Sequence, residues 1–496
     1  MSLETTLPLL VLLTSLVPGV VIFFLPEKRH GIRTLLNVGA AVAKLGLTAV
    51  MAAGIAAGHR YETRFRFVPS ADLVLRSDSW ALMFVVLSAM LWLATTIYAV
   101  GYLEGSPERS RFFGFFSLCV ASTMGIALAG NLVTFFVFYE MLTVTTYPLV
   151  VHRGTREALH AGDVYLRYTI AGGVLLLAGI ALVYALAGHG DFTEGGFLAP
   201  LGERHRTPLI VAFALLVAGL AVKAAIVPFH RWLPIAMVAP APVSALLHAV
   251  AVVKAGAFGI TRVLYDVFGL HFARDLGVTG FLAIAAAVTI IYGSCAALWQ
   301  SDLKRRLAYS TVSQISYIVL GMAVYGALST IGGSVHLVHQ GLMKVTLFFC
   351  AGNLAEELGV HDVHDLRGVA RRMPLTMAAF TIGALGMIGI PPVAGFVTKW
   401  YLGIGALEAG EGWCVVVLLA SSLLNAAYFL PIVYDAWFAE PRIVFRDRVA
   451  SAEVRLSLLL PTLATAALSI GAGALAGFSW SPLGWAKRIA SQELRP

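Results

Sequence analysis

Four lysines within long apolar runs are the residues of this sequence best suited to carry out chemistry. They are Lys223, Lys254, Lys344 and Lys399, and no arginine takes such a mid-run position. A desolvated lysine can release its proton, whereas an arginine effectively cannot. Placing an ionisable side chain at bilayer depth costs roughly 2.5–3.5 kcal/mol on insertion scales. The pattern predicts proton carriers inside a membrane. The alternative, left open above all for Lys44, is a lysine whose chain extends to the membrane surface.

Three histidines accompany these lysines. His248 precedes Lys254, while His336 and His339 share one helix face and are followed by Lys344. A histidine pair could bind a metal, but no third ligand follows at a suitable spacing, so a proton relay is favoured.

One acid, Glu140, lies in an aromatic run where an unpaired carboxylate would be costly. We therefore expect it to need a cation, and Lys223 is the natural candidate. The alternative is a purely structural buried ion pair, although such pairs are often no more stabilising than packed apolar residues.

The elements that must position these residues are apolar helices. The chain of 496 residues is 59% hydrophobic and 12% charged, against about 25% charged in soluble domains. Its apolar runs predict an all-α polytopic membrane protein of about fourteen helices. Prolines lie close to Lys223 and Lys399 and predict a broken helix at each site. These prolines are Pro228, Pro234, Pro240, Pro242, Pro391 and Pro392.

Composition also bears on cofactors and partners. The net charge of +8 does not indicate nucleic acid, because the basic residues are scattered through short loops without an aromatic-basic face. The four cysteines lack CxxC spacing, and no flavin, nicotinamide, haem or metal fingerprint is found. We expect no cofactor, a lipid environment and a multi-pass location in the cell (inner) membrane.

Three motifs resemble those of a known family, the antiporter-like proton-translocating membrane subunits of respiratory complex I, Mrp-type cation/proton antiporters and membrane-bound hydrogenases. The first is Lys223-x4-Pro-x-His-x-Trp-Leu-Pro-x-Ala. The second is Asp302-x-Lys-Arg-x-Leu-Ala-Tyr-Ser-Thr, and the third is Gly389-Ile-Pro-Pro-x-Ala-Gly-Phe-x-x-Lys.

The resemblance implies two inverted five-helix repeats, each with a broken helix. The units it suggests are residues 1–110 with a β-hairpin at 60–78, the repeats 111–270 and 271–440, and a C-terminal helix in 441–496.

The resemblance also implies roles for individual residues. Glu140 and Lys223 match the family's acid–lysine pair, and Lys254 matches the lysine that receives the proton. Lys399 matches the exit residue and is lysine where one complex I subunit type has glutamate. His336, His339 and Lys344 match the connecting helix of histidines and lysine. We expect the proton to pass through waters near these residues and near His248.

Three functions remain open. The first is a subunit that exchanges protons for Na⁺ or another monovalent cation, together with other integral membrane subunits. The second is the proton-pumping subunit of a complex I-like NADH-quinone oxidoreductase or a membrane-bound hydrogenase, whose redox chemistry lies in other chains. The third is a scaffold that moves no ions, which would need none of the buried ionisable residues.

Overall fold

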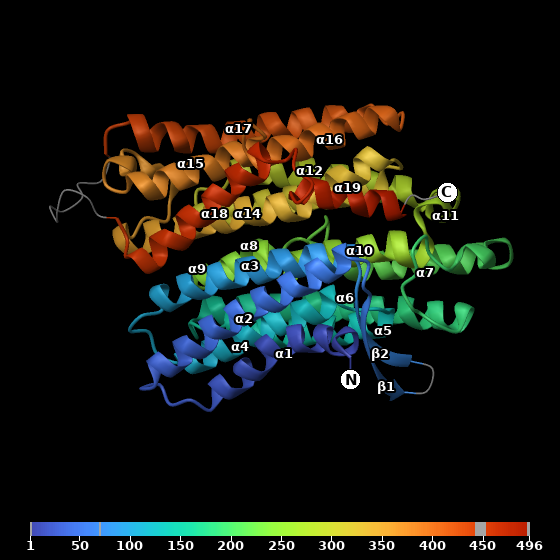
Figure 1. The fold of residues 1–496 in the computed structure, drawn as a ribbon. Helices are drawn as coiled ribbons and strands as arrows, with labels where there is room; N and C mark the ends of the chain where they lie inside the picture. Colours follow the sequence, from blue (N-terminus) through green and yellow to red (C-terminus); the bar gives the residue numbers. More distant parts are fainter. Residues whose placement is uncertain (1, 69–70, 442–452, 494–496) are drawn as a thin grey trace.

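A computed structural model describes residues 2–68, 71–441 and 453–493. Within these ranges the chain is helical apart from one hairpin (Figure 1). Part of the unit 441–496 assigned from the sequence, residues 442–452 and 494–496, lies outside the described residues.

The helices run roughly along one axis (Figure 1). The first part contains α1 (Leu3–Phe23), α2 (His30–Ala56), α3 (Ser79–Tyr102), α4 (Arg109–Ala127), α5 (Leu132–Val150) and α6 (Arg156–Ala187). The middle part contains η1 (Ala199–Leu201), α7 (Gly202–Ala224), α8 (Trp232–Ile235), η2 (Ala236–Val238), α9 (Ala241–Ala249), α10 (Val252–Arg262), η3 (Val263–Phe268), α11 (Leu270–Asp275) and α12 (Val278–Leu298). The last part contains α13 (Leu303–Ala323), α14 (Ala327–Leu358), η4 (Val363–Leu366), η5 (Val369–Arg371), α15 (Pro374–Ile388), α16 (Ala394–Glu408), α17 (Trp413–Phe438), α18 (Leu456–Ala474) and α19 (Pro482–Glu493).

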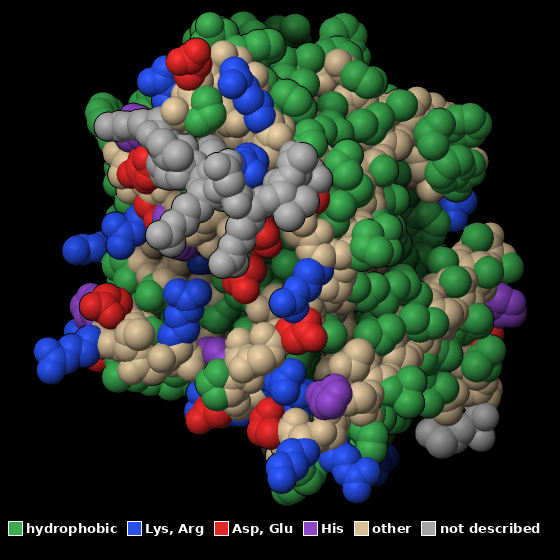
Figure 2. Space-filling model, turned by 90° about the vertical axis from the view of Figure 1, so that its left-hand side faces the viewer, with side chains coloured by type: hydrophobic (Ala, Val, Ile, Leu, Met, Phe, Trp, Pro, Cys, Tyr) green, Lys and Arg blue, Asp and Glu red, His purple; other side chains and the backbone are tan. Residues whose placement is uncertain are grey.

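Eleven helical segments among the described residues are long and apolar enough to cross a membrane. They comprise α1 to α6, α7 with η1, the run from α9 to η3, α12, α17 and α18. Two further long helices, α13 and α14, are not among them, because buried Ser, Thr, Gln, His and Lys side chains lower their hydropathy. The chain is thus a multi-pass membrane protein. Viewed onto the end opposite the hairpin, charged side chains gather on that end and hydrophobic ones cover the flank (Figure 2).

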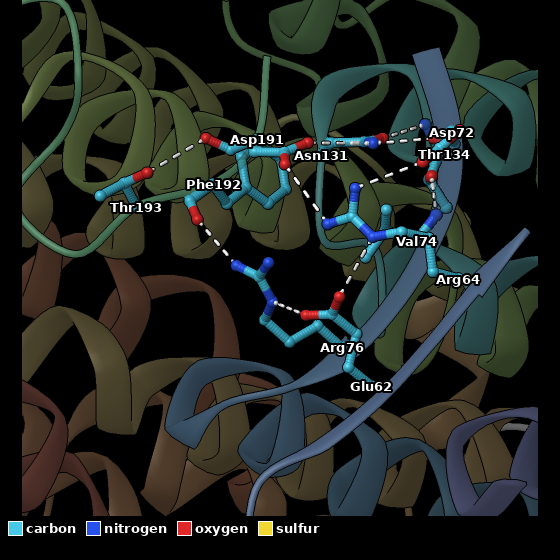
Figure 3. A network of polar contacts seen from close by, with 10 residues as sticks. All are labelled: Glu62, Arg64, Asp72, Val74, Arg76, Asn131, Thr134, Asp191, Phe192 and Thr193. Carbon is cyan, nitrogen blue, oxygen red and sulfur yellow. Dashed lines mark hydrogen bonds and ion pairs between the residues drawn. The ribbon is translucent and has the colours of Figure 1, made fainter. Parts of the chain in front are cut away.

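The alternating segment after α2 forms an antiparallel hairpin of β1 (Tyr61–Val68) and β2 (Ala71–Ser77). Asn131 caps α5 by accepting the Thr134 N–H at 2.8 Å, and its own amide donates to the Asp72 carbonyl at 2.8 Å. The Arg76 guanidinium donates to the Glu62 carboxylate at 2.8 Å and to the Phe192 carbonyl at 2.9 Å (Figure 3). The hairpin therefore fixes the start of α5, the helix that carries Glu140.

Two breaks interrupt the helices near the lysine motifs. The helix α7 ends at Ala224 and is followed by Ala225, which has a left-handed φ of 55°. The carbonyl of Val222 in the last turn of α7 accepts the Ala225 N–H at 3.2 Å and also the Trp232 indole N–H at 2.7 Å. The second break separates α15 from α16 and begins at Gly389, with φ of 96°.

The helix α14 lies at the centre of the second half. It packs against α9, α13, α15, α16 and α18. The helix α14 therefore links α9, which follows the first break, to α15 and α16 on the two sides of the second.

Candidate functional site

Lys223 and Glu140 are close together but are not joined by a direct ion pair. The Lys223 side chain is fully buried, and its Nζ donates to the Tyr139 carbonyl and lies 3.3 Å from the centre of the Tyr139 ring. Glu140 is the carboxylate that acts electrostatically on Lys223. Its Oε1 is buried without a protein hydrogen-bond partner. Glu140 and Lys223 thus lie near each other, but the ammonium group of Lys223 is hydrogen-bonded to the backbone carbonyl of the residue before Glu140.

Lys254 is also fully buried and lies on α10, just beyond the interruption between α9 and α10. Its Nζ donates to the carbonyl of Leu337 on α14. This carbonyl lies between the two α14 histidines in sequence, and Lys254 acts electrostatically on both His336 and His339. The structure therefore brings Lys254 to the histidine face of α14.

His339 connects α14 to the second break. Its Nδ1 lies 2.9 Å from the Thr398 hydroxyl, which belongs to the residue before Lys399. The Lys399 Nζ donates to the Ile388 carbonyl at 2.6 Å and to the Ser422 hydroxyl at 2.8 Å. The lysine is only partly buried, so the end of the series lies closer to the surface than its beginning.

A tyrosine provides a second contact between these groups. The Tyr317 ring lies 5.4 Å from the His336 ring, measured between centroids, and its centre is 5.6 Å from the Lys399 Nζ. The Tyr317 hydroxyl is buried without a protein partner. Tyr317 and Thr398 are not among the site residues that the sequence predicts. In the sequence, only the serines and the side-chain amide close to Tyr317 indicate that this helix is polar.

Lys344 and His248 form a separate branch. The Lys344 Nζ donates to the Leu307 carbonyl at 3.0 Å and to the Ser310 hydroxyl. His248 stacks on Phe348 with centroids 4.6 Å apart, and Lys344 acts on it electrostatically. Within the described ranges no hydrogen bond or ring contact joins either residue to Lys254, to the two histidines of α14 or to Lys399, so they lie apart from the series that these residues form.

Buried polar atoms without a protein partner are concentrated along this series. They include both ring nitrogens of His248 and His336, Nε2 of His339, and the side-chain amides of Gln314 and Gln340. Leaving such groups unpaired costs about 1–3 kcal/mol each, and in proteins they are normally satisfied by water. The arrangement can therefore accept, hold and pass protons between side chains.

Broken membrane helices that carry buried lysines and histidines beside the half-buried Glu140 are typical of ion-translocating membrane subunits. Residues 129–425 match the family described as NADH:quinone oxidoreductase/Mrp antiporter, TM. The chain belongs to this family.

Named relatives fall in several branches of the family. The chain is 39% identical to NADH-quinone oxidoreductase subunit N of Desulforudis audaxviator, over 74% of this chain and 74% of that protein. It is 27% identical to the D-type subunit of the Na(+)/H(+) antiporter of Alkalihalophilus pseudofirmus, over 98% of this chain and 97% of the relative.

The fold is also found in solved structures. The chain matches a chain of the Mrp complex from Dietzia with a TM-score of 0.85 and 25% identity, covering 100% of this chain and 98% of that one. A chain of the membrane-bound sulfane sulfur reductase, an archaeal respiratory membrane complex, matches with a TM-score of 0.84 at 23% identity, over 99% and 98% of the two chains, and shows the likeness of fold alone.

Proposed function

We propose that this chain translocates protons as one subunit of a multi-subunit membrane complex. The observation that carries the proposal is the series of contacts from Lys254 through His336 and His339 of α14 to Thr398, the neighbour of Lys399 at the second break. The helix α10, which carries Lys254, packs against α7, which carries Lys223. Protons would pass from Lys223 to Lys254, then through His336 and His339 to Lys399. His248 and Lys344 would join this series only through water.

Glu140 acts as the switch in this proposal. An opposite charge close to a lysine favours its protonated form, and desolvation disfavours it. When the Glu140 carboxylate approaches, Lys223 keeps its proton. When the carboxylate withdraws, Lys223 passes the proton on to Lys254.

The finer architecture is part of the same proposal. We infer that α13, α14 and the α15–α16 pair also cross the membrane, because they run along the same axis as the eleven apolar segments (Figure 1). This gives about fourteen spans. Two inverted five-helix repeats would each hold one of the breaks.

Exchange of protons for Na⁺ is the first candidate for the coupled process. It is supported by the nearly full-length match to the D-type Na(+)/H(+) antiporter subunit and by the match to the Mrp complex. The partners would then be the other integral membrane subunits of an antiporter in the cell (inner) membrane.

Redox-driven proton pumping is the second candidate. The observation in its favour is the 39% identity to NADH-quinone oxidoreductase subunit N. The driving electron transfer would take place in other subunits. Purifying the intact complex and identifying its subunits by mass spectrometry separates the two, because only a redox complex contains iron–sulfur or hydrogenase subunits.

The proton-transport proposal is tested with Glu140→Gln in the intact complex reconstituted into vesicles. Glutamine keeps the shape of the side chain but removes the charge that acts on Lys223. We expect a loss of proton flux on the order of 10²-fold or more, the contribution typical of a positioned acid or base. The matched control is Glu157→Gln at an exposed position of α6. Unchanged flux in an assembled Glu140→Gln complex would refute the assignment.

A further inference from the structure

A second polar path runs through the N-terminal helices, apart from the proposed relay. The helix α2 is amphipathic in an unusual sense, because its buried face is largely polar while its exposed face is apolar. The buried residues of α2 are Arg33, Asn37, Ala41, Lys44, Thr48 and Met51. Leu35, Val42 and Val50 on the outer face are 72%, 54% and 48% exposed. Polar side chains facing the interior of a membrane protein are costly and commonly functional.

Lys44 lies at the middle of this face and is fully buried. Its Nζ donates to the Ser15 hydroxyl on α1 at 2.7 Å and lies 4.4 Å from the centre of the Trp92 ring on α3. The side chain therefore does not extend to the membrane surface, and that alternative is wrong for Lys44. Among the described residues no carboxylate contacts its ammonium group.

Two separate sets of hydrogen bonds lie along the same face of α2, between Lys44 and the end opposite the hairpin. Asn37, two turns earlier on α2, accepts from the Ser117 hydroxyl of α4 at 3.0 Å. Arg33 donates to the Ser110 hydroxyl at 2.8 Å and pairs with Glu27 at 3.4 Å. Glu27 is partly exposed, so this end of the face reaches the aqueous side.

Buried polar atoms without a protein partner occur on α2 one turn from Lys44 and on α3 at Trp92 and one turn to either side of it. Within the described residues they are Thr48 Oγ1 on α2 and Ser88 Oγ, Trp92 Nε1 and Thr96 Oγ1 on α3. All four side chains are at most 2% exposed. Such groups are normally satisfied by water where the site is polar and roomy enough. Past Thr48, toward the hairpin, the fully buried Met51 closes the polar face.

We propose that Lys44 is a further proton-binding site, reached by water from the end opposite the hairpin along the buried face of α2. The groups that contact Lys44 from α1 and α3, Ser15 and Trp92, are neutral. The charged groups at the aqueous end of the face are Arg33, Glu27 and Arg109 of α4, whose Nε lies 3.9 Å from Glu27. The ligand is a proton because a lysine without a carboxylate partner repels Na⁺. A role of Lys44 in transport rests on the proposed function. The hydration of the site and the titration of Lys44 do not.

Hydration is tested by cysteine labelling in the intact complex in vesicles. Ser15→Cys and Thr48→Cys probe the Lys44 surroundings, and Val42→Cys on the lipid-facing side of α2 is the matched control. A water-soluble thiol reagent is added from the end opposite the hairpin, with the unsubstituted complex as background for the four native cysteines. We expect both probes to react faster than Val42→Cys. Reaction of both assembled probes no faster than this control overturns the proposal.

Titration is tested on the unsubstituted complex by reductive methylation over a pH series, because only the neutral amine reacts. Mass spectrometry compares Lys44 with Lys28, an exposed lysine close to the start of α2. We expect Lys44 to react with its own pH dependence. A Lys44 that stays unmodified wherever Lys28 reacts overturns the inference. A complex that moves no protons although Lys44 titrates contradicts the proposed function instead and leaves this site standing.

Discussion

Lys223 donates its hydrogen bond to the carbonyl oxygen of Tyr139, the residue that precedes Glu140, and not to the Glu140 carboxylate. The lysine is thus held by the backbone of α5 while the acid remains close enough to act on it. A lysine bound in this way can respond to a small movement of the carboxylate without losing its own position. This relationship gives the proposed switch a physical basis.

The space for the Glu140 carboxylate depends on a glycine of α6. A Cβ added at Gly173 would lie 2.6 Å from Glu140 Oε1, so Gly173→Ala must displace the carboxylate. Misplacing a reacting group by about 1 Å can lower a rate by about 10²-fold. We predict a fall of this order in proton flux of assembled complexes. Gly280→Ala, where a Cβ meets open space, is the control, and equal flux in the two variants would show that the carboxylate position does not matter.

The contact between His339 and Thr398 predicts a second effect. Thr398→Val removes the hydroxyl that lies 2.9 Å from His339 Nδ1 and keeps the shape of the side chain. A neutral hydrogen bond contributes about 0.5–1.5 kcal/mol, so we expect proton flux to fall up to about tenfold. Thr398→Ser retains the hydroxyl and should stay close to the unsubstituted rate. The contact has no part in transfer if the valine and serine variants move protons equally fast.

The contacts of the predicted site residues can be foreseen from the sequence only in part. The cost of burying Glu140 and Lys223 indicates that they belong together, and the structure does place Glu140 within electrostatic reach of Lys223. The partner of Lys223 could not be foreseen, because the Tyr139 carbonyl is a backbone group that any residue would supply. Tyr317 could not be predicted either, because a tyrosine in an apolar run is usually a packing residue.

For the helices too, the sequence predicts local features but not the contacts between distant segments. Apolar runs and prolines predict membrane helices and breaks near Lys223 and Lys399, because hydropathy and the missing proline N–H act locally. The sequence does not decide between a buried and an extended Lys44. Its burial depends on Ser15 and Trp92 in other helices, and pairing between helices is not encoded in a single run of residues.

The C-terminal helix α19 should show a pH-dependent stability. Glu493 is partly buried, and burial with Asp266 and Asp78 nearby raises its pKa from 4.5 to about 9, against the opposing effect of Arg262. The folded carboxyl keeps its proton where the unfolded one has lost it, so the stabilisation is complete below pH 4.5 and declines as the pH rises to about 9. Hydrogen exchange of the α19 amides should accelerate over this window beyond its intrinsic rate. In Glu493→Gln this extra dependence should vanish, and its persistence would contradict the assignment.

Replacing Arg262, at the end of α10, should lower the stability of the protein strongly. It is 1% exposed and lies 2.8 Å from both Asp78 and Asp266. Removing one partner of a buried ion pair leaves uncompensated charge and costs about 3–5 kcal/mol. Arg262→Met should therefore lower the thermal unfolding temperature of the purified complex markedly. Arg167→Met, which removes a pair of 3.8 Å whose arginine is 80% exposed, should change it little, and similar shifts in both variants would contradict the structural role.

Proton flux through the intact complex carrying Lys254→Arg tests most directly whether the buried lysines release protons. Arginine keeps the positive charge and can still donate to the Leu337 carbonyl, but it effectively cannot give up a proton. We predict that the assembled variant in vesicles loses proton translocation, whereas a fixed structural charge at this position would leave it intact. Transport at the unsubstituted rate by this variant would contradict the account.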